Sequence, residues 1–597
     1  MRRLVALTLT GVLVAGATST SLAGENIAPA PAKAGDWEKP FAELPIFAKR
    51  PPQTIEESLK IPPAVSMGML PDGRVIYWGG LEGIEAGTLP VAADGGKALV
   101  PSRVRLLDLR NGEPRWSKPD METGPAHDMF CADQRLLPDG RLVVVGGTIW
   151  RSDPVDVGPD APGGTVELFG SNAVRFFDPR GDRWSNNGKF MKHYRWYPTM
   201  VTLGNGNLFI ASGVARLIYN YSGQNVQETE TFDPQSGAVK VNKGESATSL
   251  PLFPRLHLLP DGRVYYGGVG QMWGPFGQSV DEALWAIHKA YDPAKETWTT
   301  YGMGPYGARS GAFSVLMPLK PPYKEARILV GGGTLGSSPG SYIANNLTEI
   351  ITVKGETSSS EAGPELNNER WYSSGVLLPD GDVLALSGAN RDEVVLPGSE
   401  SPVMQAELFD GKKWTALASA KRVRTYHNTA ILLPDGSVLV GGHSPINWGY
   451  GPGGDNTAQP VTGTNNLKDP SFEVFRPPYL FRGPRPEIAH VQSGLGWGSS
   501  FEITTPDAGR VKKVVLSRLP QVTHITDADQ RSVELDFTSN GGLLRASVPA
   551  DADVLPPGYY YLFLLSDNGQ GLTPSKARIV RVGANEIGGE ATAPMGR

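Results

Sequence analysis

The chain has 597 residues, including 73 Gly and 51 Pro, with 40% hydrophobic and 20% charged residues. These values are typical of a globular protein with many turns, and the length exceeds the roughly 100–200 residues of one ordinary domain. We therefore expect several domains or a repeat architecture. The net charge of −5 at pH 7 provides no basic surface for nucleic acid or for an anionic membrane, so neither is an expected partner.

At the N-terminus, Met1-Arg2-Arg3 precedes an apolar run, Leu4 to Ala17, and a small-residue segment that ends at Ala23. This order predicts a secretory signal peptide over 1–23. An uncleaved membrane anchor is the alternative, although the run is shorter than the roughly 20 apolar residues that a span needs. We expect a secreted or extracytoplasmic protein, at the cell surface or in the periplasm, with no other membrane segment.

The chain contains a single cysteine, Cys131. One cysteine excludes an intrachain disulfide framework, and it excludes zinc or iron–sulfur sites built from several thiolates. In an exported protein a lone thiol is either free or modified, and it needs an explanation.

One phrase recurs along the chain. LPDGRVIYWGG at Leu70 returns with changes at five further positions, and a degenerate copy begins at Leu316 in the longest gap between them. In each unit, Asp-Gly or Asn-Gly marks a hairpin turn, the apolar run marks a buried inner strand, and Gly-Gly lets backbones approach closely. The five further copies start at Leu137, Leu203, Leu259, Leu378 and Leu433.

Several units continue with an aspartate turn and a strand that carries Trp, as in FFDPRGDRW from Phe176. Short strands, Gly-rich turns and a periodic aromatic residue are typical of a propeller blade. Helical periodicity is nearly absent, and the stretch from Asp281 to His288 is the best helical candidate. We predict an all-β chain with a seven-bladed kelch-type β-propeller over 51–471, after an N-terminal extension at 24–50.

After Phe472 the repeat stops. A proline-rich junction, FEVFRPPYLFRGPRPEI, leads into short alternating runs such as KKVVLSRL and YYYLFLLS. This pattern predicts an Ig-like β-sandwich over 472–583. The last residues, 584–597, are expected to form a tail.

Two phrases contain residues that can bind a metal ion. RVRTYHNTAILLPDG places Tyr426 beside His427 on a strand, and RLPQVTHITDADQR places His524 in a turn of the sandwich. Neighbours on a strand point to opposite faces, so Tyr426 and His427 reach one ion only at a strand end or bend. Taken alone, each phrase is more simply explained by ordinary packing.

As a set, the phrases carry more information. DMFCADQRLLPDGRLVVVGG around Cys131, RWYPTMVTLGNGN around Tyr197, the Tyr426-His427 phrase, VFRPPYLFRGPRP, THITDADQR and LPPGYYYLFLLSDNGQ follow one another in this order. Together they resemble the galactose oxidase and glyoxal oxidase family of mononuclear copper radical oxidases. The resemblance extends over about residues 65–583.

The resemblance implies one copper ion on the propeller axis, bound by His427, His524, Tyr197 and Tyr426. It also implies a thioether between Cys131 Sγ and the ring of Tyr197, which is oxidised to a radical. Imidazole and phenolate suit copper, and a divalent ion favours the ionised phenol. Cys131 and Tyr197 are about one repeat apart, which predicts adjacent blades with their axial ends close together.

The implied reaction oxidises a primary alcohol to an aldehyde, or an aldehyde hydrate to a carboxylic acid, and reduces O2 to H2O2. Tyr426 would accept the hydroxyl proton as general base, and the Tyr197 radical would abstract hydrogen from the carbinol carbon. The expected partners are a small alcohol or aldehyde and O2, and the expected state is a monomer. No GxGxxG phrase predicts a nicotinamide or flavin site.

The sequence departs from the family at the tryptophan that stacks on the cross-linked tyrosine in galactose oxidase. The corresponding stretch here, LFIASGVARLIYNYSG, contains no Trp. Trp273, on a Gly-rich loop, is the first candidate for this catalytic role, and Trp196 is the competing one. We find no match to the sugar-recognising residues of galactose oxidase, so galactose specificity is not expected.

The alternative function is a non-enzymatic, exported kelch propeller that binds a polysaccharide or another protein, because propellers host many unrelated functions. This alternative predicts that Tyr426, His427 and His524 lie apart and bind no copper. A propeller hydrolase is a third possibility in principle, but it needs a carboxylate pair, and no pair in the sequence stands out.

Overall fold

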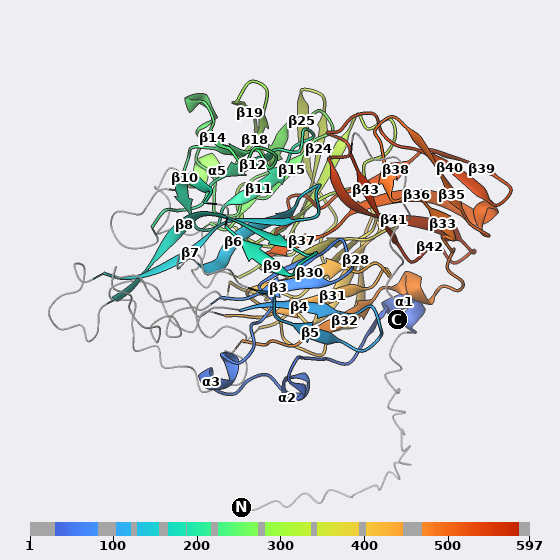
Figure 1. Ribbon diagram of the computed structural model, residues 1–597, viewed down its shortest axis with the longest axis horizontal. Helices are drawn as coiled ribbons and strands as arrows, with labels where there is room; N and C mark the ends of the chain where they lie inside the picture. Colours follow the sequence, from blue (N-terminus) through green and yellow to red (C-terminus); the bar gives the residue numbers. More distant parts are fainter. Residues whose placement is uncertain are drawn as a thin grey trace, which may run out of the picture.

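A computed structural model describes residues 30–80, 103–120, 128–153, 165–186, 188–216, 225–272, 281–335, 343–392, 401–445 and 468–583. The predicted signal peptide, the predicted tail and Trp273 lie outside these residues. Figure 1 shows a ring of sheets with the C-terminal β domain, in orange and red, packed against it. The predicted propeller followed by a sandwich is confirmed.

Seven antiparallel sheets form the blades of the propeller. The first contains β2 (Ser66–Met69), β3 (Val75–Trp78), β4 (Val104–Asp108) and β5 (Arg115–Ser117). The second contains β6 (Asp128–Leu136), β7 (Leu142–Asp153), β8 (Thr165–Asp178), β9 (Arg183–Ser185) and β10 (Phe190–Arg195). The third contains β11 (Thr199–Thr202), β12 (Leu208–Ala211), β13 (Glu230–Phe232) and β14 (Val239–Val241).

The remaining blades follow in chain order. The fourth contains β15 (Leu256–Leu258), β16 (Val264–Tyr266), β18 (Ile287–Asp292) and β19 (Thr297–Met303). The fifth contains β21 (Phe313–Leu316), β22 (Ala326–Gly331), β24 (Thr348–Lys354) and β25 (Thr357–Ala362). The sixth contains β26 (Ser374–Leu377), β27 (Val383–Leu386), β28 (Gln405–Phe409) and β29 (Trp414–Ser419). The seventh contains β30 (Asn428–Leu432), β31 (Val438–Gly442), β32 (Glu473–Arg476) and β1 (Asp36–Trp37).

The repeated phrase forms the predicted hairpin in each blade that carries it. In the first, Gly73 N donates to Leu70 O and Leu70 N donates to Arg74 O, which is a turn closed by a bulge. The glycine of the six clear copies has a φ between 84° and 99°, a region that side chains disfavour. The inner strands that these turns connect, such as β2 and β3, are buried along their whole length.

The seventh blade is closed by the N-terminal part of the chain. β1 pairs antiparallel with β32, with Trp37 opposite Phe475. The propeller therefore extends from Asp36 to Arg476, beyond the predicted limits of 51 and 471 on both sides. Both outer strands lie outside the range 51–471, because a two-residue strand has no readable pattern and because β32 lies inside the proline-rich junction.

Short helices are few among the described residues. α1 (Pro31–Ala34), α2 (Pro45–Lys49) and α3 (Ile55–Ser58) precede the first blade, and α5 (Asp281–Trp285) lies in the predicted helical stretch. In this part of the chain no helix has the length and apolar character needed to cross a membrane. A small extra sheet joins β17 (Val269–Gly270), β20 (Arg309–Ser310) and β23 (Thr334–Leu335).

The C-terminal domain is a sandwich of two sheets with a shared apolar core. One sheet contains β33 (His490–Val491), β35 (Ser500–Thr504), β40 (Leu543–Ser547) and β39 (Phe537–Asn540). The other contains β34 (Gly494–Leu495), β43 (Arg578–Val582), β41 (Gly558–Asp567), β36 (Val511–Arg518), β38 (Ser532–Leu535) and β42 (Leu572–Pro574).

One segment of this domain enters the propeller. β37 (Gln521–Thr523) pairs antiparallel with β2, the inner strand of the first blade. The approach is close: a Cβ on Gly68 would lie 2.0 Å from Gln521 Oε1, so a larger residue at that position of β2 would force the Gln521 side chain to move. β37 thus delivers the turn that carries His524 to the inner strands of the ring.

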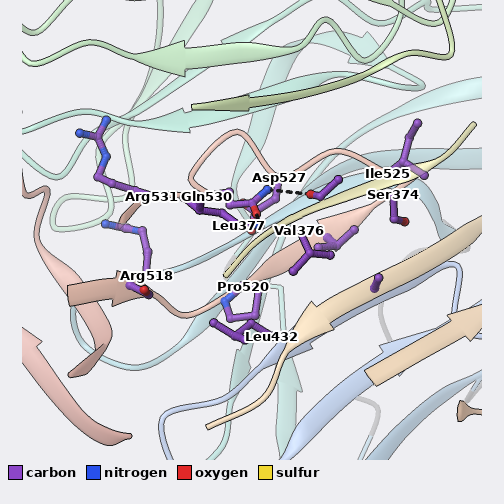
Figure 2. A pocket seen from close by; sticks show the side chains of 14 residues that line it. Ser374, Val376, Leu377, Leu432, Arg518, Pro520, Ile525, Asp527, Gln530 and Arg531 are labelled. Atoms are coloured by element: carbon purple, nitrogen blue, oxygen red, sulfur yellow. Dashed lines mark hydrogen bonds between the residues drawn. The ribbon is translucent and has the colours of Figure 1, made fainter. Parts of the chain in front are cut away.

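A small cavity lies beside this segment, between β26, β30 and the residues that flank β37 (Figure 2). Its volume is about 30 Å³, and Asp527, Gln530, Arg518 and Arg531 are among its lining side chains. A space of this size holds about two water molecules. It is too small to admit an organic substrate.

Candidate metal centre

The residues that meet at the centre of the ring share one position in their blades, just before or within the start of the inner strand. Cys131, Tyr197, Phe253, Tyr372 and His427 occupy this position in five blades, with φ values of 64°, 63°, 40°, 57° and 59°. A left-handed backbone costs a non-glycine residue about 1–3 kcal/mol and is concentrated at functional sites. The fifth blade has Gly311 there, with a φ of 66°.

Backbone hydrogen bonds connect these positions from blade to blade. Tyr197 N donates to Cys131 O at 3.0 Å, and Phe253 N donates to Tyr197 O at 2.8 Å. Tyr372 N donates to Gly311 O at 2.8 Å in the same way. The backbone also bends at His427, just before β30. This bend allows Tyr426 and His427, which are neighbours in sequence, to face one site.

Four of the predicted site residues converge. Tyr197 Oη lies 2.8 Å from Tyr426 Oη and 3.2 Å from His427 Nε2. The imidazole of His524 lies 4.5 Å from that of His427 and 4.6 Å from the Tyr197 ring, between centroids. All four side chains are buried.

Each imidazole is oriented by a contact of its Nδ1. His427 Nδ1 donates to Ser444 O at 2.7 Å, which leaves Nε2 as the unprotonated nitrogen facing Tyr197. His524 Nδ1 lies 2.7 Å from Thr523 Oγ1, and this hydroxyl lies 2.9 Å from Ser66 Oγ. Such outer contacts fix the tautomer of metal-binding histidines.

The electrostatic surroundings keep both imidazoles neutral. Burial lowers the pKa of His427 and the pKa of His524 well below the ordinary value for histidine. A neutral imidazole with a free Nε2 is the form that binds a transition metal.

Cys131 lies beside the same group. Its Sγ is 3.7 Å from His524 Nε2, and the side chain is fully buried. A bulge in the pairing of β6 with β7 falls between Asp128 and Ala132, and a bulge of this kind re-aims a side chain. Cys131 therefore reaches the ring centre from the blade next to the one that carries Tyr197, as the repeat spacing predicts.

Of the two tryptophans considered for stacking on Tyr197, the structure describes one. Trp196 stacks on Tyr197 with 3.7 Å between ring centroids and 5° between ring planes. Trp273, our first candidate, lies outside the described residues. Within those residues, Trp196 therefore provides the stacking on Tyr197.

Three further aromatic contacts were missing from the predicted site. Phe253 lies 4.4 Å from Tyr197 between centroids, and Phe130 lies 5.4 Å from His427. Trp371 stacks on Tyr426 at 5.7 Å. The signal for Trp371 was present in the sequence, because Arg-Trp-Tyr occurs both at residues 195–197 and at residues 370–372.

The donor set fits a copper ion. Two donors at right angles, each about 2.0 Å from one ion, are about 2.8 Å apart, and the two phenol oxygens and His427 Nε2 have separations of this order. Two imidazoles with two phenols suit copper better than zinc. No group of three or more His, Cys, Asp or Glu side chains in the described part of the chain offers a competing metal site.

Two protein families match the chain, one over each domain. The family described as "Glyoxal oxidase N-terminus" matches residues 161–456, and "Galactose oxidase-like, Early set domain" matches residues 485–582. The order of the two matches is the order of the propeller and the sandwich.

Curated relatives show the same similarity at about one quarter identity. "Aldehyde oxidase GLOX" of Vitis pseudoreticulata is 26% identical over 76% of this chain and 82% of its own length. "Galactose oxidase" of Gibberella zeae is 26% identical over 76% of this chain and 61% of its own length. A "WSC domain-containing protein" of Arthroderma benhamiae is 27% identical over 79% of this chain, which spans about half (48%) of that relative.

A solved structure shares the fold. A fungal alcohol oxidase in complex with copper is 20% identical, with a TM-score of 0.67, over 92% of this chain and all of the other. The paired family matches, the ordered sequence phrases and the converging Tyr and His side chains agree. This chain belongs to the galactose oxidase and glyoxal oxidase family.

Proposed function

We propose that this protein is a copper radical oxidase that converts primary alcohols or aldehydes to aldehydes or carboxylic acids and reduces O2 to H2O2. The observation that carries the proposal is the convergence of Tyr197, Tyr426, His427 and His524, with Cys131 at their side. The relatives named as aldehyde and galactose oxidases support the same class of reaction. Export through the segment 1–23 is part of the proposal.

His427, His524, Tyr197 and Tyr426 would hold the copper ion. When bound, copper would supply a one-electron redox partner and a coordination position for the substrate oxygen. The histidines are neutral before binding, because burial lowers the pKa of each, so no proton has to leave them.

Tyr426 would act as the general base. Its phenol oxygen lies 2.8 Å from that of Tyr197, so a proton that it takes from a substrate hydroxyl stays at the reacting centre. Trp371 covers one face of its ring and Tyr372 approaches it at 4.6 Å. These contacts hold the Tyr426 oxygen toward Tyr197 and exclude water from its ring.

Tyr197 would abstract the hydrogen atom from the carbinol carbon while it is cross-linked to Cys131. Formation of the thioether removes the thiol hydrogen and one ring hydrogen of Tyr197, and O2 is the oxidant that accepts them. In turnover, a primary alcohol loses two hydrogens to become an aldehyde, and O2 gains two hydrogens to become H2O2. Trp196 and Phe253 shield the Tyr197 ring from solvent.

The test is to purify the protein without metal, add one equivalent of copper under air, and measure its mass and its peroxide production. We expect a mass loss of two hydrogens, a long-wavelength absorption band after one-electron oxidation, and peroxide from a panel of primary alcohols and aldehydes. A copper-loaded sample that shows no mass loss and no peroxide with any substrate would contradict the proposal.

The non-enzymatic alternative requires Tyr426, His427 and His524 to lie apart. They lie together instead, with ring centroids of neighbouring pairs 3.7 Å and 4.5 Å apart. We therefore do not favour a propeller that only binds a polysaccharide or a protein.

A further inference from the structure

A buried group of charged residues lies a few residues along the chain from Cys131 and His524. We call Asp133, Arg135 and Asp529 the buried hub. The side chains of Asp133 and Arg135 have no exposed surface, and Asp529 is 8% exposed. Asp133 Oδ1 accepts from Arg135 Nη1 at 2.8 Å, and Arg135 Nε lies 3.7 Å from Asp529 Oδ1.

The hub connects the strand of Cys131 to the strand that follows Tyr197. Asp133 Oδ2 accepts from Met200 N at 2.7 Å, while Arg135 Nη2 donates to Met200 O at 2.6 Å. One backbone residue of β11 is therefore bound on both its N–H and its C=O by side chains of β6. The inner strands β6 and β11 belong to different blades and are not paired by backbone hydrogen bonds. The hub therefore fixes the position of β11 along β6, as backbone pairing would do within one sheet.

The same hub holds the segment that carries His524. Asp529 Oδ1 accepts from Thr202 N at 2.9 Å, which joins the turn after His524 to β11. Gln134 Nε2, between the two hub residues of β6, donates to Val522 O at 2.9 Å. Three chain segments, each with one site residue, are thus fastened to one another within a few residues of the site.

The energetics favour a role in specificity over one in stability. Removing two charges from water costs several kcal/mol per ion, and apolar side chains of the same volume often stabilise a core as well as a buried ion pair does. The best-attested use of such a pair is to fix one register among several that apolar packing would allow.

We propose that Asp133 and Arg135 are positioning residues that set Cys131, Tyr197 and His524 in the register required for thioether formation. The inference rests on the proposed function, because it concerns the cross-link of that function. It adds that the hub, which touches neither copper nor substrate, determines how fast the cofactor forms.

The test compares Asp133→Asn with Glu349→Gln as a matched control. Glu349 is 1% exposed and lies 3.6 Å from His288 Nε2, and the residue of its blade at the position equivalent to Cys131 is Gly311. Each change removes one buried negative charge at constant volume. For Asp133→Asn we expect the copper-dependent loss of two hydrogens to slow by about ten- to a hundredfold, as for other contacts that orient a metal site. Glu349→Gln should keep the wild-type rate.

A second, metal-free measurement separates the hub from the proposed function. Backbone hydrogen exchange should become faster in 131–136, 197–203 and 519–531 together in Asp133→Asn, and in none of them in Glu349→Gln. If wild-type protein forms no thioether while this exchange pattern is observed, the proposed function fails and the coupling of the three segments stands.

Unchanged exchange in these segments, or cross-linking of Asp133→Asn at the wild-type rate, would overturn the inference. Should Asp133→Asn not fold, Thr202→Val provides a milder variant, because it removes only the hydroxyl that contacts Asp529. It should slow cross-linking in the same direction by a smaller factor, at a temperature well below its unfolding transition.

Discussion

At the scale of single residues, the site is defined by how each ring is held. Tyr197 is stacked by Trp196, its neighbour in the first Arg-Trp-Tyr sequence, whereas Trp371 of the second Arg-Trp-Tyr sequence stacks on Tyr426, which lies in another segment. The copies differ in the preceding blade. A Cβ at Gly311 would lie 2.4 Å from Trp371 Nε1, so Trp371 occupies the space in which a cysteine of that blade would stand.

The first prediction concerns Trp196→Phe. The smaller ring leaves a small void in the buried site and gives up part of the stacking, which is worth about 0.5–1.5 kcal/mol beyond area burial. We expect the oxidised protein to lose its long-wavelength absorption several times faster than wild type, while copper binding is retained. Trp371→Phe is the matched control, and an equal decay in both variants would show that stacking on Tyr197 has no special effect.

The second prediction concerns Cys131→Ala. Removal of the sulfur eliminates the mass loss of two hydrogens, since no thioether can form, and most of the oxidase activity is lost with it. Copper still binds, because all four expected ligands remain. Mass spectrometry and copper titration check both parts, and a cross-linked mass in Cys131→Ala would refute the assignment of the sulfur.

The third prediction concerns Thr523→Val, which removes the hydroxyl 2.7 Å from His524 Nδ1. Without this partner the imidazole loses its fixed tautomer and orientation, so copper affinity should fall about ten- to a hundredfold. Thr523→Ser keeps the hydroxyl and should restore most of the affinity in the same competitive titration. Equal affinities for Val and Ser would contradict the orienting role.

At the scale of elements, the sequence was informative wherever a pattern repeats. The Leu-Pro-Asp-Gly phrases, and the related Leu-Gly-Asn-Gly at Leu203, predict the hairpins that position Cys131, Tyr197 and His427 at one end of their blades. Local patterns could not predict β1, which is two residues long, or the docking of β37 on β2. That docking depends on the fit of Gln521 against Gly68, which no pattern within either segment expresses.

The family resemblance accounts for most of the predicted site, because spacing alone does not single out His524 among the histidines. Phe130, Phe253 and Trp371 were not predicted, since a buried aromatic residue beside an inner strand is common in any propeller. The contacts of Phe130 and Phe253 with the site emerge only once the blades are placed around one axis, whereas the repeated Arg-Trp-Tyr sequence was an unused signal for Trp371.

The fourth prediction belongs to β15, which carries His257. Burial lowers the pKa of His257 to about 3, so the folded protein keeps it neutral while the unfolded chain protonates it below its ordinary value near 6.5. Its contribution to stability is therefore fully present above about pH 6.5 and is lost as the pH falls. Relative to His257→Gln, the metal-free wild type should lose about 2 kcal/mol of unfolding free energy between pH 7 and pH 5. Urea unfolding at the two pH values tests this, and parallel pH profiles would contradict it.

At the scale of the whole molecule, the ring is held shut by contacts between distant parts of the chain. β1 supplies the outermost strand of the last blade, where Trp37 packs on Phe475 and its Nε1 donates to Ala418 O at 2.9 Å. β37 ties the first blade to the sandwich from the inside. Figure 1 shows the first blade, in blue, beside the last, in orange.

The fifth prediction tests this closure with Trp37→Ala. Truncating a buried Trp costs about 3–5 kcal/mol, and the loss falls on the outer strand of the last blade and on its contact with the sixth blade. We expect a clear decrease in the thermal unfolding midpoint, a smaller one for Trp37→Phe, and loss of the propeller and sandwich signals together. An unchanged midpoint for Trp37→Ala would show that β1 is dispensable for closure.

The insertion of β37 also sets an order in time. A ribosome completes every blade of the propeller before it reaches His524, so a growing chain presents three of the four expected ligands and lacks the last. Under the proposed function, copper loading and the oxidative chemistry would follow only after the sandwich has been made and has docked. A chain truncated before His524 would then lack the fourth expected ligand and form no complete copper site.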